Sequence, residues 1–543
     1  MRRTLLDHLV EQVAPQHALQ RYAARARIEL MQASLQGAQA MDDSGYTSTA
    51  GGDSFLSRWV TQPRSAAADT LRRISDQRGQ ARALVRNHPL AASAINTNVA
   101  RAIGTGLVWV PMPHLKTLGW TVQQAKAWAE EVSAEHAMWA DSTACDYYGD
   151  QTFYGLQDLV TRSRLESGDC FSMLPDGAPT STQPYRLRVQ VLEADRVGNP
   201  NNVTDNAQVA GGIRRGADGL VDGVHVYRQH PGSLYFGKAA PAYEGDWVVP
   251  VGPSGRRRIL HHFKRLRPEM PRGVSYLAPV MGLFKLLGDY TDAEVKAAVV
   301  SAFLTMVIET PTGAGAAPIF GMAGGDAAGA GAGQSAAADV ELGPGAVIAL
   351  AKGEKANVVD PGRPNPAFGP FVQAVLDQLG AGTFIGSELL LKKFSTSYTA
   401  ARAAWLDAWK HLLDVRTQTA VDFCQPVTET WLAEAVATGR IRAPGFFSDP
   451  RMRWAYCRGA WHGDSQGSLN PRDEVTAFLD AVDGGLTTLT RGSWELFGQD
   501  FNAVVEQRAA DDAALAARSI TLRPRAGAPA AQPTPAPQPR APG

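Results

Sequence analysis

Residues 280–310 read VMGLFKLLGDYTDAEVKAAVVSAFLTMVIET, and they lie between Pro279 and Pro311 without an internal proline. The large and small apolar residues of this stretch recur near helical spacing, at Leu283, Leu287, Tyr290, Ala298, Phe303 and Val307. A helix that filled the window would be about 45 Å long at ~1.5 Å per residue, well above the usual globular length. The stretch therefore predicts one unusually long helix.

A second proline-free stretch, residues 371–425, predicts two further helices, one near 371–379 and one near 399–422. Between the two long stretches, residues 313–338 consist almost entirely of Gly, Ala and other small residues. Such a composition cannot build a core and predicts a flexible insertion. Short strands are expected after it, at 346–350 and 356–359.

Upstream of the long helix, the apolar period changes from helical spacing to two. Tyr185, Leu187, Val189 and Val191 alternate with polar residues, as in a half-buried strand. We expect further strands at 107–110, 224–227 and 247–251, helices within 66–102, a strand-like return that contains Trp454 and Trp461, and a helical region that begins at Pro471 with acidic residues in its first turn. The fold class predicted from these patterns is α+β.

The composition restricts the class of protein. The 543 residues correspond to roughly three or four folding units at ~150 residues each, and 44% of them are apolar. The 53 Lys and Arg residues balance 53 Asp and Glu residues, so the chain cannot coat nucleic acid by bulk charge. The apolar run 297–308 is shorter than the ~20 residues of a membrane span, and the N-terminus has no signal-peptide core, so we expect neither a membrane protein nor a secreted precursor.

Common enzyme signatures are absent or incomplete in the sequence. Residues 232–238 have the GxxxxGK spacing of a phosphate loop, but Ala239 replaces the Ser or Thr that would bind magnesium. His261 and His262 would point to opposite faces of a strand and could not chelate one ion. The four cysteines, at 145, 170, 424 and 457, are too widely spaced for a CxxC pair, and we expect reduced, mostly buried thiols. The sequence shows no catalytic site, metal site or cofactor site.

Lys392-Lys393 is the basic feature that is relevant to nucleic acid. The pair lies in a predicted loop between helices, with Leu389-Leu390-Leu391 before it and Phe394-Ser395-Thr396-Ser397 after it. A solvated surface loop is one interpretation. The other is that the two cations meet phosphate groups without base specificity, and several copies around a pore would concentrate that charge.

Several segments, in their order along the chain, resemble the portal proteins of tailed bacteriophages of the lambda type. They are Arg82–Asn96 leading to Ile103–Leu107, Glu193–Asn199, His262–Pro279 followed by the long helix with Asp289-Tyr290, Phe394–Ala404, Gly485–Thr488 and Gly498–Asp500. None is a catalytic signature, so the specificity of the resemblance lies in their order and spacing over nearly the full length. One departure is Ser397, which stands where an asparagine is expected before Tyr398.

The resemblance implies the portal fold: a wing, a stem of long helices, a small α/β clip and a helical crown, assembled as a ring. Carried onto this chain, the parts are a flexible N-terminal arm (1–65), an α+β wing (66–275), a first stem helix (276–308), a clip with the Gly/Ala-rich insertion (309–367), a second stem helix and tunnel loop (368–398), a long helix and wing return (399–471), a helical crown (472–516) and a disordered Pro/Ala-rich tail (517–543).

The resemblance also implies a function without catalysis and without a cofactor. It implies a homododecameric ring at one capsid vertex, through which double-stranded viral DNA is packaged and ejected, and which helps to initiate procapsid assembly. The implied partners are further copies of the chain, the DNA, the terminase large subunit, a head-completion or adaptor protein, and the major capsid and scaffold proteins, with no membrane. The implied location is the virion, and the host cytoplasm during assembly.

The implied DNA-facing residues are those of the tunnel loop, near 389–398: Lys392, Lys393, Ser395 and Thr396. Two other hypotheses remain open beside the portal. A packaging or cell-entry enzyme would need a phosphate loop or a carboxylate cluster, and the sequence offers neither. A ring-forming capsid adaptor or scaffold would assemble in the same way but would not line the DNA path.

Overall fold

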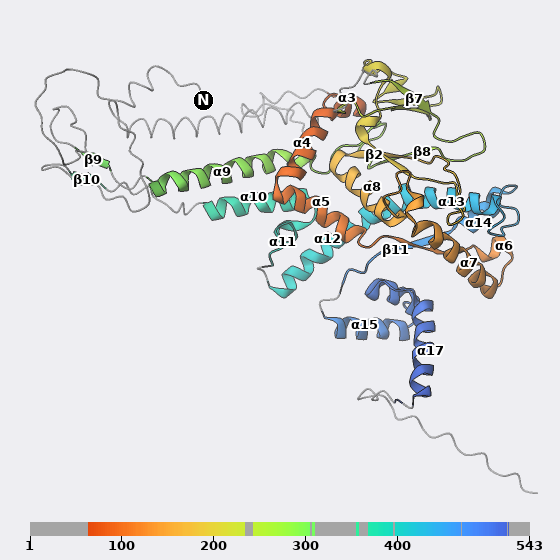
Figure 1. Cartoon of the computed structure of the whole chain (residues 1–543). Coiled ribbons are helices and arrows are strands. Elements are labelled where there is room, and N and C mark those ends of the chain that lie inside the picture. Colours follow the sequence, from red (N-terminus) through yellow and green to blue (C-terminus); the bar gives the residue numbers. More distant parts are fainter. Residues whose placement is uncertain are drawn as a thin grey trace, which may run out of the picture. The chain divides into compact units, whose positions relative to one another are not determined.

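A computed structural model describes residues 63–233, 243–303, 307–309, 355–357, 368–394, 397–467, 470–518 and 520 (Figure 1). The chain divides into two compact units, which are described separately. Unit 1 comprises 1–104 and Pro111–Gly459, and unit 2 comprises Thr105–Val110 and Ala460–Gly543. The N-terminal arm, the C-terminal tail, the insertion at 313–338 and the strand expected at 346–350 lie outside the described residues.

Two antiparallel sheets form the centre of unit 1. The three-stranded sheet has the order β3–β2–β8, with β2 (Asp169–Met173) between β3 (Gln190–Glu193) and β8 (Ile259–Phe263). The four-stranded sheet follows chain order, and its strands are β4 (Val209–Ala210), β5 (Ile213–Arg215), β6 (Val221–Tyr227) and β7 (Gly245–Val248). One hydrophobic cluster, which includes Phe171 from β2 and Val224 from β6, joins the two sheets.

Helices surround these sheets and continue into the rest of unit 1. Their bounds are α3 Ala66–Leu71, α4 Ile74–Asn87, α5 Pro89–Ala102, α6 Leu115–Leu118, α7 Val122–Ala140, α8 Phe153–Ser167, α9 Met281–Phe303, α10 Phe368–Gly382, α11 Gly386–Leu391, α12 Tyr398–Thr419, α13 Gln425–Ala437 and α14 Pro450–Cys457. A π-helical turn, Ala420–Cys424, joins α12 to α13. The described part of the chain contains no helix that is both long and apolar enough to cross a membrane.

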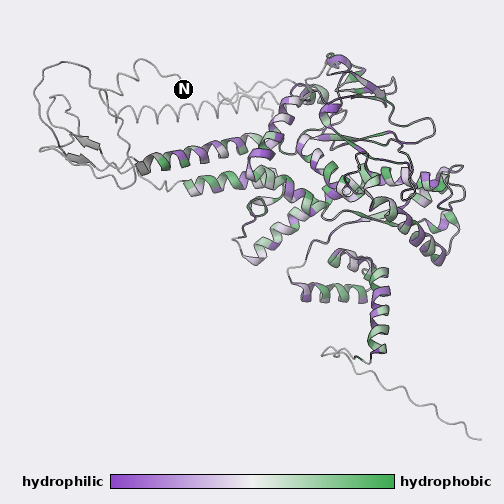
Figure 2. Ribbon diagram, in the orientation of Figure 1, coloured by the Kyte–Doolittle hydropathy of each residue, from purple (hydrophilic) through white to green (hydrophobic). Residues whose placement is uncertain are grey.

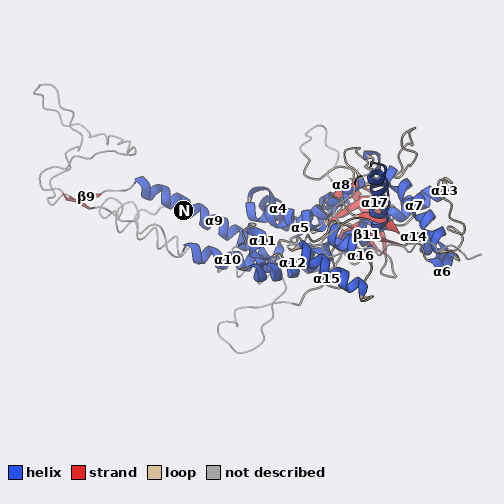
Figure 3. Cartoon of the chain, turned by 90° about the horizontal axis from the view of Figure 1, so that it is seen from below, coloured by secondary structure: helices blue, strands red, loops and turns tan. Residues whose placement is uncertain are grey.

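Helices α9 and α10 lie side by side and extend away from the sheets of unit 1 (Figures 1 and 3). Tyr290 of α9 joins them by stacking on Phe368 at 5.6 Å and meeting Phe371 edge-on at 4.8 Å between ring centroids. Hydrophobic residues dominate α10 (Figure 2). The long-helix prediction is confirmed for Met281–Phe303, which is about 35 Å long at ~1.5 Å per residue.

The structure corrects the end of that helix and one other element. Residues 307–309 form strand β9, which pairs antiparallel with β10 at 355–357, so the described helix ends before the predicted residue 308. Trp454 lies in α14 and not in a strand, because Asp449 accepts a hydrogen bond from the Arg451 N–H and caps a helix that opens with Pro450. Trp461 does lie in a strand, β11.

In unit 2, strands β1 (Val108–Pro111) and β11 (Gly459–His462) pair with each other. The helical elements that follow are α15 (Pro471–Asp483), α16 (Leu489–Gly492), a π-helical turn η6 (Ser493–Phe497) and α17 (Phe501–Ala517). The helical region predicted from Pro471 is therefore confirmed.

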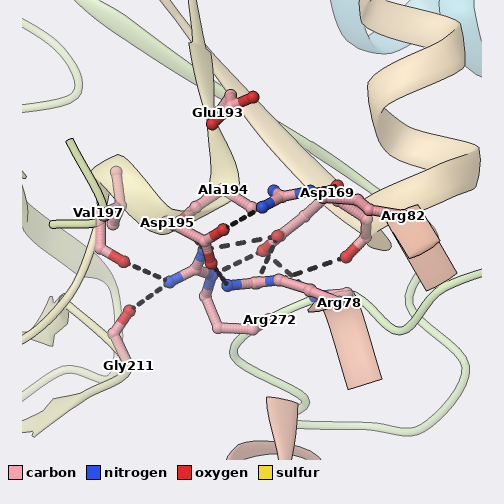
Figure 4. Close-up of polar contacts among 12 residues, drawn as sticks. Arg78, Arg82, Asp169, Glu193, Ala194, Asp195, Val197, Gly211 and Arg272 are labelled. Carbon is pink, nitrogen blue, oxygen red and sulfur yellow. Dashed lines mark hydrogen bonds and ion pairs between the residues drawn. The ribbon is translucent and has the colours of Figure 1, made fainter. Parts of the chain in front are cut away.

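A buried ion cluster ties the helices of unit 1 to both sheets (Figure 4). Asp169, at the start of β2, has no solvent exposure. Its carboxylate accepts hydrogen bonds from Arg78 of α4 at 2.6 Å and Arg272 at 2.5 Å, and lies 3.0 Å from His261 Nε2 on β8. Arg272 also donates to the carbonyl groups of Ala194, Val197 and Gly211, on the segments that lead into the four-stranded sheet.

The charges of this cluster compensate each other. Burial opposes ionisation of Asp169, but Arg272 and Arg78, with the hydrogen bond from His261, outweigh it and hold the pKa of the carboxyl well below its usual range. Asp195 provides the second carboxylate, and it contacts both Arg78 and Arg82. Every buried charge therefore has a partner of opposite sign, which is the condition for tolerating ions in a protein interior.

Close backbone contact places Asp169 at this position. Gly168, with φ +92°, precedes Asp169 and lies against Gly273, which follows Arg272. A Cβ atom on Gly273 would lie 2.0 Å from the carbonyl oxygen of Gly168, so neither segment could approach the other with a side chain between them. The two glycines allow β2 and residue 272 to come within reach of one carboxylate.

A second polar junction holds the segment between α10 and α11. Phe384, in this segment, has φ +54°, and its ring stacks on His411 of α12 at 5.3 Å; His411 stacks in turn on Tyr276 at 5.8 Å. Asn98 of α5 is fully buried: its amide nitrogen donates to the Tyr276 hydroxyl at 3.2 Å, and its oxygen lies 3.0 Å from His411 Nε2. The Tyr276 hydroxyl donates to the Thr383 carbonyl.

The Asp169→Asn substitution tests the ion cluster. It keeps the shape of the side chain but leaves two buried arginines without a countercharge, and we expect a loss of about 3–5 kcal/mol in the free energy of unfolding of unit 1. Because the folded pKa is lowered, the contribution of Asp169 is complete above the unfolded pKa of ~3.9 and is lost as the pH falls below it. Urea unfolding as a function of pH measures both effects.

Asp222→Asn is the matched control. Asp222 pairs with Arg214 at 2.7 Å on the surface, where an ion pair contributes about 0–1 kcal/mol. Equal losses from the two substitutions would show that the Asp169 cluster contributes no more than a surface pair.

The Asn98→Ala substitution tests the junction. It removes the hydrogen-bond partner of two buried groups, on Tyr276 and His411, and we expect a loss of about 1–3 kcal/mol per unsatisfied group, with faster hydrogen exchange in α11. Asn96→Ala on the same helix is the control, since Asn96 is exposed and accepts one hydrogen bond from Arg162 at 2.7 Å. Unchanged exchange in α11 for Asn98→Ala would contradict the role of the junction.

Candidate nucleic-acid interface

The loop between α11 and α12 begins with the two lysines that the sequence singled out. Lys392 ends α11, and its N–H donates to the Glu388 carbonyl, as does the N–H of Lys393 at 3.1 Å. Both lysine side chains are exposed, and neither forms an ion pair with another described residue. Ser395 and Thr396, the other two predicted DNA-facing residues, lie outside the described residues.

Lys392 has a left-handed backbone, with φ 54° and ψ 32°. This is the usual conformation of the residue after the last helical turn, and glycine is the residue most often found there. A side chain costs about 1 kcal/mol or more in this conformation. The backbone at Lys392 therefore does not require a lysine, and the charge is a property of the side chain alone.

The helices on either side of the loop fix its two ends. In α11, Leu389 and Leu390 are buried, and the Ser93 hydroxyl of α5 donates to the Leu390 carbonyl at 2.8 Å. At the other end, Ser397 is the N-cap of α12, where its side chain accepts a hydrogen bond from the Ala400 N–H. Serine and asparagine cap helices about equally well, so Ser397 can fill the role of the asparagine expected there.

Aromatic side chains accompany the lysines on this surface. Phe394 and Tyr398 are exposed on either side of the undescribed pair, and Phe384 is exposed at the base of α11. A loop with cations and exposed aromatic rings can contact phosphate groups and apolar surfaces without recognising a base sequence. This arrangement of side chains favours non-specific contact with a nucleic-acid backbone.

The other candidate groups from the sequence have structural partners. His261 belongs to the Asp169 cluster, whereas His262 lies 2.8 Å from the Ser172 hydroxyl, on the opposite face of β8. Burial, with a smaller contribution from His261, lowers the pKa of His262 to about 3. Within the described ranges, no three His, Cys, Asp or Glu side chains are grouped so that they could hold a metal ion.

The four cysteines are free and buried, as predicted. Burial raises the pKa of the Cys145 and Cys457 thiols to about 12, so neither is a reactive thiolate near neutral pH. The glycine-rich segment 232–238 lies mostly outside the described residues.

One surface pocket accompanies the ion cluster. It has a volume of about 340 Å³ and is lined by Arg82, Val85, Arg86, Ser163, Glu166, Ser167, Glu193 and Ala194. Sequence patterns could not have revealed it, because its residues come from α4, α8 and the end of β3, more than 100 positions apart at the extremes. Burial raises the pKa of Glu166 against the opposing effect of Arg82 and Arg162. Its two glutamates and two arginines leave the pocket without a dominant charge.

Comparisons with known proteins identify the family. A family model described as phage portal protein, lambda family, matches residues 53–416, about two thirds of the chain. Portal protein B of Escherichia phage lambda is 25% identical over 489 residues, which cover 85% of this chain and 90% of that protein. The portal protein of Escherichia phage N15 is 26% identical over 494 residues, with coverages of 86% and 91%.

A solved structure of the virion of a native gene transfer agent particle contains a similar chain, with a TM-score of 0.41, 13% identity, and coverage of 80% of this chain and 93% of that one. The assignment rests on the family model, which spans both sheets, the α9–α10 pair and the lysine loop. This chain belongs to the lambda family of phage portal proteins.

Proposed function

We propose that the protein forms a dodecameric ring at one vertex of a phage capsid and conducts double-stranded DNA during packaging and ejection. The observation that carries this proposal is the pair of exposed lysines, Lys392 and Lys393, on a loop held at both ends by packed helices. Membership of the portal family gives the context in which such a loop would face DNA.

The proposed parts of the ring follow the elements of the chain. Helices α9 and α10 form the stem, and residues 309–367 between them form the clip, where a terminase and a head-completion protein would dock. The loop at 389–398, with Lys392, Lys393, Ser395 and Thr396, lines the channel, and residues 472–516 form the crown. Contacts with capsid and scaffold proteins during procapsid assembly in the host cytoplasm belong to the same proposal.

We infer a structural role and no catalytic one, with the energy for packaging supplied by a separate terminase. The zero net charge of the chain supports a conduit, since many tight phosphate contacts would prevent DNA from sliding. The second candidate, a ring-forming adaptor that does not line the DNA path, differs from the first only in whether the lysines meet DNA.

The oligomeric state tests the ring. We expect the purified full-length chain to have a native mass near twelve times 58.0 kDa and to show a central pore by electron microscopy. A stable monomer or dimer, even in the presence of scaffold and capsid proteins, would refute the conduit.

Substitution of the loop lysines tests contact with DNA. The double variant Lys392→Gly/Lys393→Ser should form rings of unchanged stability within about 1 kcal/mol, because glycine suits the left-handed backbone at 392. We expect it to lose DNA retention in packaging assays, and to reduce the slope of log affinity against log salt by about one for each phosphate contact removed.

Lys392→Arg/Lys393→Arg keeps both charges and is the matched control. It should retain DNA as the wild type does. If the uncharged variant packages and retains DNA normally, the adaptor hypothesis is favoured over the conduit.

A further inference from the structure

The helical part of unit 2 buries almost none of its own side chains. In the segment 470–518, every residue of which but one is exposed or half-buried, only Gly492 is buried. The ring of Phe478, on α15, packs so closely on Gly492 that a Cβ atom there would lie 2.1 Å from it. One such contact is too little to offset the conformational entropy lost when the whole segment becomes ordered.

A first apolar patch lies on α15 and the residues that follow it. Val475, Phe478, Leu479 and Val482 recur at helical spacing along one side of α15, as in a helix that buries one face. Leu479, Leu486 and Leu489, which define the first patch, are nevertheless 41%, 84% and 46% exposed.

A second apolar patch consists of Phe497 in η6 and Val504 and Val505 in α17, which are 61%, 39% and 48% exposed. Helix α17 contacts α16 and does not pack along α15; the two helices run in different directions (Figure 1). Its polar contacts are pairs within the helix, such as Arg508 with Asp512 at 3.0 Å, and pairs of this kind stabilise a helix only slightly.

The charge of the segment limits what could cover these patches. Residues 471–518 contain four arginines and no lysine, against nine Asp and Glu residues, a net charge of −5. This charge repels the phosphates of DNA and of anionic membranes, so neither is the partner. The two patches require a protein surface.

We propose that residues 471–518 pack against the same segment of a neighbouring copy, with the first patch of one copy on the second patch of the next. Head-to-tail contacts that close into a ring need two different surfaces on each chain, and the segment has two. Its six exposed apolar side chains offer about 100 Å² each, roughly 600 Å² in all, close to the ~800 Å² that one partner contributes to a standard interface. The inference rests on the proposed ring, and it adds that this segment becomes ordered only on assembly.

Repulsion between the like charges of neighbouring copies gives this contact a distinctive salt dependence. Each copy brings −5, so the charges oppose the apolar contact and salt screens them. Packing between copies should therefore strengthen as ionic strength rises. Packing against a basic protein would weaken instead.

Hydrogen exchange of the full-length chain, measured in separated monomer and ring fractions, tests the proposal. We expect amides of α15 and α17 to exchange at least 100-fold more slowly in the ring than in the monomer, with protection in the ring rising between 50 mM and 500 mM salt. Equal exchange rates in the two fractions, or protection that falls with salt, would overturn it.

Substitutions in each patch test the geometry of the contact. Leu486→Ser in the first patch and Phe497→Ser in the second should each remove the protection of α15 and α17 in rings. Leu220→Ser, at a leucine that is 68% exposed in unit 1, is the control and should change nothing in this segment. Rings assembled from an equal mixture of the two variants should recover part of the protection, because some contacts then join two intact patches; no recovery would exclude the head-to-tail arrangement.

The two proposals can fail separately. If the wild-type chain forms no ring, the proposed function fails. If rings form and residues 471–518 remain unprotected within them, only the present inference fails.

Discussion

Asp169 places a negative charge in the interior of unit 1, and the surrounding chain is arranged to compensate it. Arg78 reaches the carboxylate from α4, His261 from β8, and Arg272 from the segment that leads toward α9. Removing a buried ion from water is costly unless all its hydrogen bonds are made, so these segments can adopt few other arrangements. The long helix α9 begins nine residues after Arg272, and its starting position therefore depends on this one carboxylate.

The two ends of the functional argument differ in how they are held. The lysine loop is exposed, yet its flanking helices are packed on α5, and the Asn98 junction satisfies the polar groups between α10 and α12. The helices of unit 2 have no comparable core within one chain. A single subunit thus contains a part whose order is complete and a part that needs a neighbour, a combination expected of a chain that functions only in an assembly.

Sequence patterns predicted the elements whose information is local. The proline-free stretches and apolar spacing located α9, α10 and α12, and the loop with Lys392 and Lys393 falls between helices as expected. They could not reveal the Asp169 cluster, because Arg78 and Arg272 are almost 200 positions apart and single charged residues carry no periodic signal. Trp454 was assigned to a strand because the cap at Asp449 outweighs a short apolar pattern.

The left-handed backbone of Lys392 also affects how related sequences should be interpreted. Folding alone would favour glycine at this position, so drift without selection on charge would tend to replace the lysine. A lysine or arginine at the aligned position of a relative would therefore indicate selection for the cation, whereas a glycine would indicate that only the turn is needed. One aligned position thus separates pressure on the shape of the loop from pressure on its charge.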